Sequence, residues 1–222
     1  MNRVFLLSPA NCNGLRARWV LRKNSRSDLA RGLRGNGVPL GEVFSFLSAL
    51  YFRGKLAYAH AFARPPLDCP GILIITPTSG LMPHDTLIRL PKLRGFGRVP
   101  IQLKNRLYCS SLQRTAKKLA RDIGSDCELV LLGSLASRKY LEILSPIFGS
   151  RLRVPAEFIG RGDMSRGGLL LRCVRENRQL NYIAATDLSA AGPRRCRTHN
   201  QTVGNLPRQP TIPEDFLTEE KN

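Results

Sequence analysis

Short apolar runs alternate along this chain with longer segments of helical periodicity, and this alternation is the feature that most limits its possible folds. The apolar runs lie at residues 4–7, 71–76 and 128–132, and the helical segments at 15–21, 40–63, 107–123 and 136–148. An uninterrupted apolar run is typical of a strand buried on both faces, as in a parallel sheet with helices on each side. The sequence therefore predicts the α/β class with a largely parallel, Rossmann-like sheet.

The C-terminal part of the chain predicts two further features. Residues 168–174 form another apolar run, and residues 180–184 can pair with it, which predicts one C-terminal hairpin. From residue 188 the apolar periodicity ends and proline recurs, so this segment cannot bury enough apolar surface to offset its ordering entropy. We therefore expect a single α/β domain over residues 1–187 and a disordered tail over residues 188–222.

The charge balance is strongly basic. Lys and Arg number 35 against 16 Asp and Glu, which gives a formal net charge of +19 at pH 7. A field of this sign attracts anionic partners, so we expect either an anionic, nucleotide-like ligand or a nucleic acid. The alternative explanation is an arginine-rich overall composition that has no meaning for any particular site.

The six cysteines do not predict a metal site. None belongs to a Cys-x-x-Cys pair, and only Cys196 has a histidine close by, so the spacing of zinc ligands is absent. No apolar stretch approaches the roughly 20 residues that cross a bilayer, and the N-terminal residues lack a signal-peptide pattern. We therefore expect a cytoplasmic protein with free thiols, no metal and no membrane partner, and the sequence indicates no particular cofactor.

Polar segments follow the predicted strands, which is where ligands bind in open α/β sheets. The candidate ligand-binding residues in these segments are Ser8, Asn11 and Arg16 after the first strand, Thr78 and Ser79 after the second, and Gly133, Ser134 and Arg138 after the third. Such groups at a helix start can bind a phosphate. They can also cap the helix or form hydrogen bonds with the backbone of their own turn. Cys12 would have a lowered pKa in this setting.

The segment at 157–168 is the most specific, because it combines glycines with arginines and acids. We interpret residues 160–168 as a loop whose glycines let the backbone approach a ligand closely. The ligand-binding residues expected here are Gly160, Arg161, Gly162, Ser165 and Arg166, and the expected catalytic residues are Asp163 and Glu157. Arginines bind phosphate through two parallel hydrogen bonds, and a carboxylate can act as acid, base or nucleophile. The alternative is a glycine-rich hairpin loop stabilised by an Arg–Asp salt bridge.

Three segments resemble a family of uncharacterised bacterial α/β proteins. They are Ser8-Pro9-x-x-Cys12, Tyr51-Phe52-Arg53-Gly54-Lys55-Leu56-x-Tyr58-Ala59 and Gly160-Arg161-Gly162-Asp163-Met164-Ser165-Arg166-Gly167-Gly168. The resemblance covers residues 1–187 and implies an α/β fold without assigning catalytic residues. The order of elements is also loosely similar to that of nucleoside deoxyribosyltransferases, which use a carboxylate nucleophile near a glycine-containing loop. No motif of theirs matches this chain residue by residue, so that similarity concerns fold order alone.

These observations favour an enzyme that acts on a nucleotide, a nucleoside or a related phosphorylated ligand at the carboxyl ends of the strands. Asp163 or Glu157 would supply the acid, base or nucleophile, and Arg161 and Arg166 would hold phosphate. Hydrolysis or transfer of a glycosidic bond is the reaction class that this arrangement suggests. The alternative is a non-catalytic nucleic-acid-binding protein that uses its basic surface.

Overall fold

The computed structural model describes residues 1–135 and 138–190. The strands are β1 (Asn2–Leu7), β2 (Val38–Pro39), β3 (Ile72–Thr76), β4 (Gly80–Pro83), β5 (Leu87–Ile88), β6 (Cys127–Leu132), β7 (Leu152–Pro155) and β8 (Tyr182–Ala184). The helices are α1 (Leu15–Leu21), α2 (Asp28–Arg34), α3 (Leu40–Phe62), α4 (Leu90–Arg98), α5 (Arg106–Asp122), α6 (Leu141–Phe148), α7 (Asp163–Arg175) and α8 (Asp187–Ala190), with short 3-10 turns at Gly149–Arg151 and Ala156–Phe158. The predicted tail lies outside the described residues from residue 191 onward, and its first residues belong to α8.

The main sheet has six strands in the order β4-β3-β1-β6-β7-β8. The four central strands β3, β1, β6 and β7 are parallel, and β4 and β8 are antiparallel edge strands. β1 lies between β3 and β6 and pairs with β6 along all of its residues, from Asn2 opposite Cys127 to Leu7 opposite Leu132. The predicted α/β class with a largely parallel sheet is therefore confirmed.

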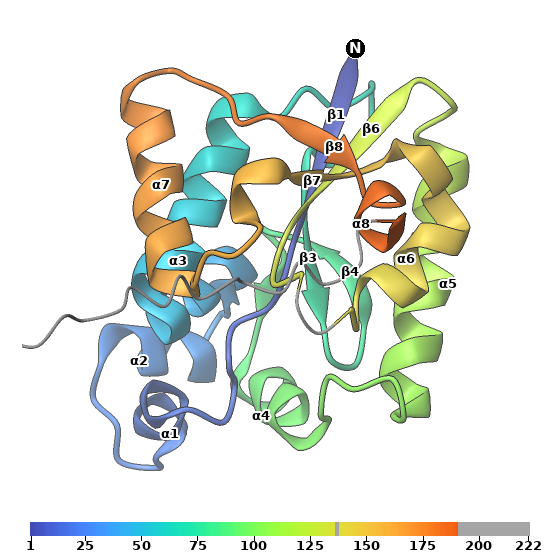
Figure 1. Cartoon of the computed structure of the whole chain (residues 1–222). Helices are drawn as coiled ribbons and strands as arrows, with labels where there is room; N and C mark the ends of the chain where they lie inside the picture. Colours follow the sequence, from blue (N-terminus) through green and yellow to red (C-terminus); the bar gives the residue numbers. More distant parts are fainter. Residues whose placement is uncertain (136–137, 191–222) are drawn as a thin grey trace, which may run out of the picture. The chain divides into compact units, whose positions relative to one another are not determined.

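Helices cover both faces of this sheet, with α3 and α7 on one face and α5 and α6 on the other (Figure 1). Successive residues of a strand point to opposite faces, so Phe5 and Leu7 of β1 pack in the core under α3, while Val4 and Leu6 pack in the core under α5. All four side chains are fully buried. Burial on both faces is the physical reason why the central strands are apolar at every position.

The prediction of a loop at 160–168 and a strand at 168–174 is wrong, because α7 runs through both segments. A Cβ atom on Gly54 of α3 would lie 2.8 Å from the carbonyl oxygen of Gly167, and one on Gly167 would lie 2.9 Å from Cα of Tyr51. The glycine at 167 is therefore required for the close contact of two helices rather than for a loop. The predicted hairpin of 168–174 with 180–184 is therefore wrong as well: β8 pairs antiparallel with β7, and α7 lies between these two strands in the chain.

The long helix α3 is broken at one residue. Ala49 has φ 46° and ψ −122°, a left-handed conformation that costs a non-glycine residue of order 1–3 kcal/mol. Gly54, in contrast, is helical and serves the contact with α7. Within residues 1–135 and 138–190, no helix combines the length and the apolar character needed to cross a membrane.

Candidate functional site

The candidate site lies at the carboxyl ends of β1 and β6, where the chain changes direction across the sheet. From β1 the chain continues through α3 to β3 on one side, and from β3 and β4 it continues through α5 to β6 on the other side. α3 follows β1 and α6 follows β6, and these two helices cover opposite faces, so the chain leaves the carboxyl ends of β1 and β6 in opposite directions. Ligands bind at such switch points in open α/β sheets. Ser8 follows β1 directly, and its N–H donates a hydrogen bond to the carbonyl oxygen of Leu132 over 3.1 Å.

A buried lysine of α3 reaches this point. Lys55 is 1% exposed, and its Nζ donates to the carbonyl oxygen of Ser8 over 2.6 Å and to Ser8 Oγ over 2.9 Å. The amine also lies 4.6 Å from the ring centre of Tyr51 and 4.7 Å from that of Phe52. Burial lowers the pKa of Lys55 to about 7, and the negative charge of Asp163 opposes this shift. Burial therefore favours the neutral form of this amine.

A second buried cation lies at the start of α7. Arg166 is 6% exposed, its Nη1 forms an ion pair with Asp163 Oδ1 at 3.1 Å, and its Nη2 donates to the carbonyl oxygen of Phe158 over 3.0 Å. The guanidinium group also lies over the ring of Phe158, at 5.4 Å from the ring centre. The side chain of Asp163 remains 62% exposed, so the pair extends from the protein interior to solvent.

Two tyrosine hydroxyls surround these charges. Burial raises the pKa of Tyr51 to about 12 and raises that of Tyr140 further, and in both cases the charge of Asp163 adds to the rise. The charge of Arg166 opposes the rise at Tyr51. Within the described residues, the buried hydroxyl of Tyr51 has no hydrogen-bond partner. A buried polar atom without a partner is a candidate contact for a ligand.

A cleft of about 310 Å³ opens beside these residues. Its walls come from the loop after β1, the end of β3, the α4–α5 connection and the segment before α6. The lining residues are Pro9, Ala10, Asn11, Cys12, Asn13, Pro77, Phe96, Val99, Pro100, Ile101, Gln102, Lys139 and Tyr140. The lining residues named here are mostly apolar or carry amide groups, and among them only Lys139 is cationic.

The structure brings some of the predicted site residues together. Ser8 lies against Gly133, where an added Cβ atom would meet Ser8 Cβ at 3.0 Å, and Asp163 and Arg166 form their pair close enough to Lys55 for Asp163 to influence its pKa. Asn11 lines the cleft. Gly162 caps α7, Gly160 has φ 74°, and Arg161 donates to Ser165 Oγ over 3.3 Å at the surface.

Other predicted residues make local contacts away from Lys55. Arg16 donates to the carbonyl oxygen of Phe46, the carbonyl oxygen of Thr78 accepts from Ser111 on α5, and Ser79 Oγ accepts from Lys92 on α4. Glu157 Oε1 accepts from the N–H of Asn181, while its Oε2 is buried without a partner among the described residues. Ser134 is half-buried after β6, and Arg138 is exposed with φ 48°.

The lowered pKa expected for Cys12 is wrong. Its thiol is buried and donates to the carbonyl oxygen of Ala10, and burial raises its pKa to about 12. A protonated thiol of this kind is a poor nucleophile. In the part of the chain that the structure describes, no group of three or more His, Cys, Asp and Glu side chains is placed to hold a metal ion.

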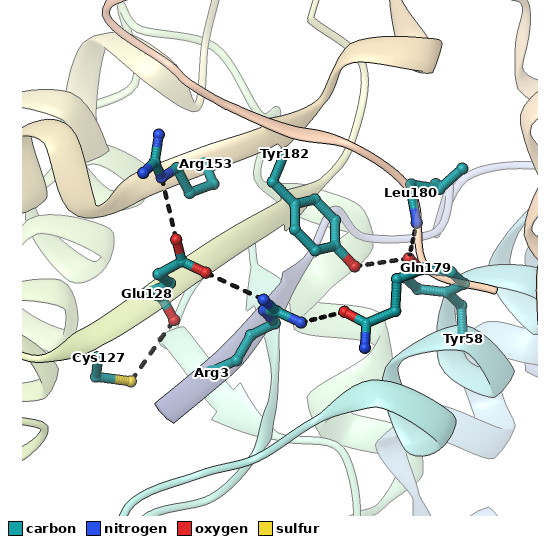
Figure 2. Close-up of polar contacts among 8 residues, drawn as sticks. All are labelled: Arg3, Tyr58, Cys127, Glu128, Arg153, Gln179, Leu180 and Tyr182. Atoms are coloured by element: carbon teal, nitrogen blue, oxygen red, sulfur yellow. Dashed lines mark hydrogen bonds and ion pairs between the residues drawn. The ribbon is translucent and has the colours of Figure 1, made fainter. Parts of the chain in front are cut away.

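A second polar cluster lies at the opposite ends of the same two strands (Figure 2). Glu128 of β6 forms ion pairs with Arg3 of β1 at 3.2 Å and with Arg153 of β7 at 3.3 Å. Beside it, the hydroxyls of Tyr58 and Tyr182 are 2.6 Å apart, and the hydroxyl of Tyr58 accepts from the N–H of Leu180. These contacts connect β1, β6, β7, β8 and α3, so the cluster joins the elements of one sheet face.

Comparison with known proteins adds no assignment to this geometry. No protein-family model matches the sequence, and no curated protein or solved structure shows a detectable match to it.

Proposed function

We propose that this protein is an enzyme that acts on a nucleotide, a nucleoside or a related phosphorylated ligand at the carboxyl ends of β1 and β6. The observation that carries the proposal is the environment of Lys55. Its amine is buried at the switch point of the sheet, and among the described residues no carboxylate lies within ion-pair distance of Nζ. Burying an amine without a counter-charge is costly, and such groups concentrate at functional sites.

The surrounding groups supply complementary chemistry. In its neutral form Lys55 can take the proton of a hydroxyl, and Ser8 Oγ at 2.9 Å is the nearest one. In its protonated form, Lys55 can instead bind an anionic oxygen together with Arg166. Asp163 extends from Arg166 toward solvent and is the carboxylate best placed to act as acid, base or nucleophile. Hydrolysis or transfer at a glycosidic or phosphoryl centre is the reaction class we propose.

The cleft favours a ligand with a planar base. The side chains of Asn11, Asn13 and Gln102 carry both donors and acceptors, which match the edge of a nucleobase. Apolar walls such as Phe96 and Ile101 can pack against its faces. The net charge of +19 adds long-range attraction for a phosphorylated ligand.

A thermal-shift panel tests this proposal. Nucleosides, nucleotides and sugar phosphates are added in turn to the wild-type protein, to Lys55→Met and to the surface control Lys117→Met on the exposed face of α5. We expect at least one ligand class to raise the melting temperature of the wild type and of the control but not of Lys55→Met. The absence of any shift in the wild type, or an equal shift in Lys55→Met, would contradict the proposal.

The surface charge supports the second candidate, a non-catalytic nucleic-acid-binding protein. Binding through many phosphates weakens by orders of magnitude between about 50 and 200 mM salt. A small ligand held by Lys55 and Arg166 should lose far less affinity over the same range. Tight oligonucleotide binding that is steeply salt-dependent and survives Arg166→Ala would favour this candidate over the enzyme.

A further inference from the structure

The short helix α1 exposes an apolar and aromatic face that the core does not use. Leu15 is 61% exposed and Trp19 is 46% exposed, while Ala17 and Val20 of the same helix are buried. Arg18 and Arg22 are also exposed; positions 15, 18 and 19 lie on one side of α1, because they are three and four residues apart, and Arg22 follows directly as the C-cap of the helix. We call Leu15, Arg18, Trp19 and Arg22 the α1 face.

A second exposed aromatic residue lies on α3, which contacts α1. Arg16 of α1 donates from Nη1 to the carbonyl oxygen of Phe46 in α3 over 3.1 Å, which holds the two helices together there. Phe46 is 39% exposed. Leu15, Trp19 and Phe46 are therefore exposed large apolar side chains on two helices that contact each other.

The same region carries positive charge without compensation. Residues 1–27 contain no Asp or Glu. The exposed cations of α1 and of the turn that follows it are Arg16, Arg18, Arg22, Lys23 and Arg26. The first acid in the chain, Asp28, is already paired with Arg31. A partner for this region must therefore be anionic and must also offer flat apolar surfaces.

We propose that the α1 face binds single-stranded nucleic acid, with phosphates on the arginines and a base stacked on Trp19. Exposed aromatic rings between cations are how proteins hold single strands. The inference rests on the proposed function and narrows its substrate to a nucleotide within a strand. Residues 9–13, which line the cleft, lead within two residues into α1, so the cleft and the α1 face belong to adjoining segments of the chain.

Trp19 is the only tryptophan in the chain, so its fluorescence reports directly on this surface. The probe is an oligothymidylate of roughly 16 nucleotides, the upper end of known site sizes for single-strand binding folds. We expect the oligonucleotide to quench the fluorescence of Trp19. In anisotropy measurements with a labelled oligonucleotide, Trp19→Ala should weaken binding by about tenfold.

Two double variants distinguish binding at the α1 face from nonspecific attraction by the net positive charge. Arg18→Gln/Arg22→Gln removes two charges from the α1 face, and Lys117→Gln/Lys118→Gln removes two from the exposed side of α5. The first pair should weaken binding by at least tenfold and reduce the slope of log affinity against log salt by about 1.4, at about 0.7 for each phosphate contact. The second pair should change affinity by less than about threefold.

Three outcomes would overturn the inference: no quenching by the oligonucleotide, equal loss in both pairs of variants, or quenching by anionic phospholipid vesicles but not by the oligonucleotide. The thermal shift by free nucleotides, measured on the same variants, keeps the proposed function separate. If that shift persists in all of them while the oligonucleotide fails to quench Trp19, only the α1 face is misassigned. If quenching is present and free nucleotides cause no shift, the cleft assignment is wrong and the α1 face stands.

Discussion

β1 and β6 carry a buried polar cluster at each end, and the two clusters differ in how their charges are compensated. At the amino ends, Glu128 has two arginines within 3.3 Å, so its charge is matched twice (Figure 2). At the carboxyl ends, Lys55 is bonded to the two oxygens of Ser8, which are both neutral. Both clusters join the strands to helix α3, through Tyr58 at one end and Lys55 at the other.

This difference separates a structural role from a functional one. A buried carboxylate with two cationic partners is costly to disrupt, because its removal leaves the partners uncompensated. A buried amine with only neutral partners lowers the stability of the folded protein, because no counter-charge offsets the free energy lost when the amine leaves water. Mutations at the amino-end cluster should therefore reduce stability and leave ligand binding intact. Mutations at the carboxyl-end cluster should instead weaken ligand binding and change stability less.

The largest effect should follow from Glu128→Gln. This change leaves Arg3 and Arg153 without their counter-charge, and we expect the free energy of unfolding to fall by about 3 kcal/mol. Urea denaturation of the wild type and of the variant measures this loss. Glu142→Gln, an exposed acid in the first turn of α6, is the control and should change stability by less than about 0.5 kcal/mol. A loss of less than 1 kcal/mol for Glu128→Gln would show that the amino-end cluster is not the more structural of the two.

The next largest effect should come from the contact between α3 and α7. A Cβ atom on residue 167 would lie 2.9 Å from Cα of Tyr51 and 3.1 Å from the carbonyl oxygen of Leu50, so Gly167→Ala must push the two helices apart. We expect a loss of about 2 kcal/mol and weaker ligand binding, because Arg166 and Tyr51 move with their helices. Gly168→Ala is the matched control, since no atom lies within 4 Å of its added Cβ. That control should be neutral or should stabilise the helix by about 0.5 kcal/mol.

The α3–α7 contact also shows what local sequence patterns can and cannot predict. The apolar runs at 71–76 and 128–132 predicted buried strands correctly, because burial on both faces determines every side chain of such a strand. The glycines at 160–168 were interpreted as a loop because local propensity gives no sign of a neighbouring helix. Gly167 is fixed by a contact with Gly54, which is more than a hundred residues away in the sequence.

The candidate site was predicted in part for a similar reason. Segments that follow parallel strands must converge at one edge, so Ser8 and Gly133 meet there as expected. Lys55 was missed, although its sequence position contains a signal. It lies four residues after Tyr51 and three before Tyr58, both of which are buried, so its side chain shares their face of the helix. Its bond to Ser8 spans 47 residues and is created by the tertiary fold alone.

The pH dependence of stability should report on the amine at the carboxyl-end cluster. The pKa of Lys55 is about 7 in the folded protein and 10.5 in the reference state, so between these values the unfolded chain binds a proton that the folded protein does not. Stability should therefore increase as the pH rises through this window, with a slope of up to about 1.4 kcal/mol per pH unit. The slope is measured as wild type minus Lys55→Met, in urea, from about pH 7 to 8.5, so that the ionisation of unfolded cysteines cancels between the two proteins. Identical slopes in the two proteins would show that the amine is not desolvated.

The smallest change in stability should come from Asp163→Asn, and this variant separates charge from shape at the mouth of the site. Asp163 is the first residue of α7 and pairs with Arg166 three residues later, and Asp28 is the first residue of α2 and pairs with Arg31 in the same way. Both acids are mostly exposed, so each substitution to Asn should cost about 1 kcal/mol or less. Asp163→Asn should in addition abolish the ligand-induced rise in melting temperature, because Arg166 loses its ion-pair partner and Lys55 loses the nearby charge of Asp163. Asp28→Asn should keep that rise in full. If both variants keep it, Asp163 serves only to cap and pair α7, and the carboxylate that acts on the ligand must be sought at Glu157.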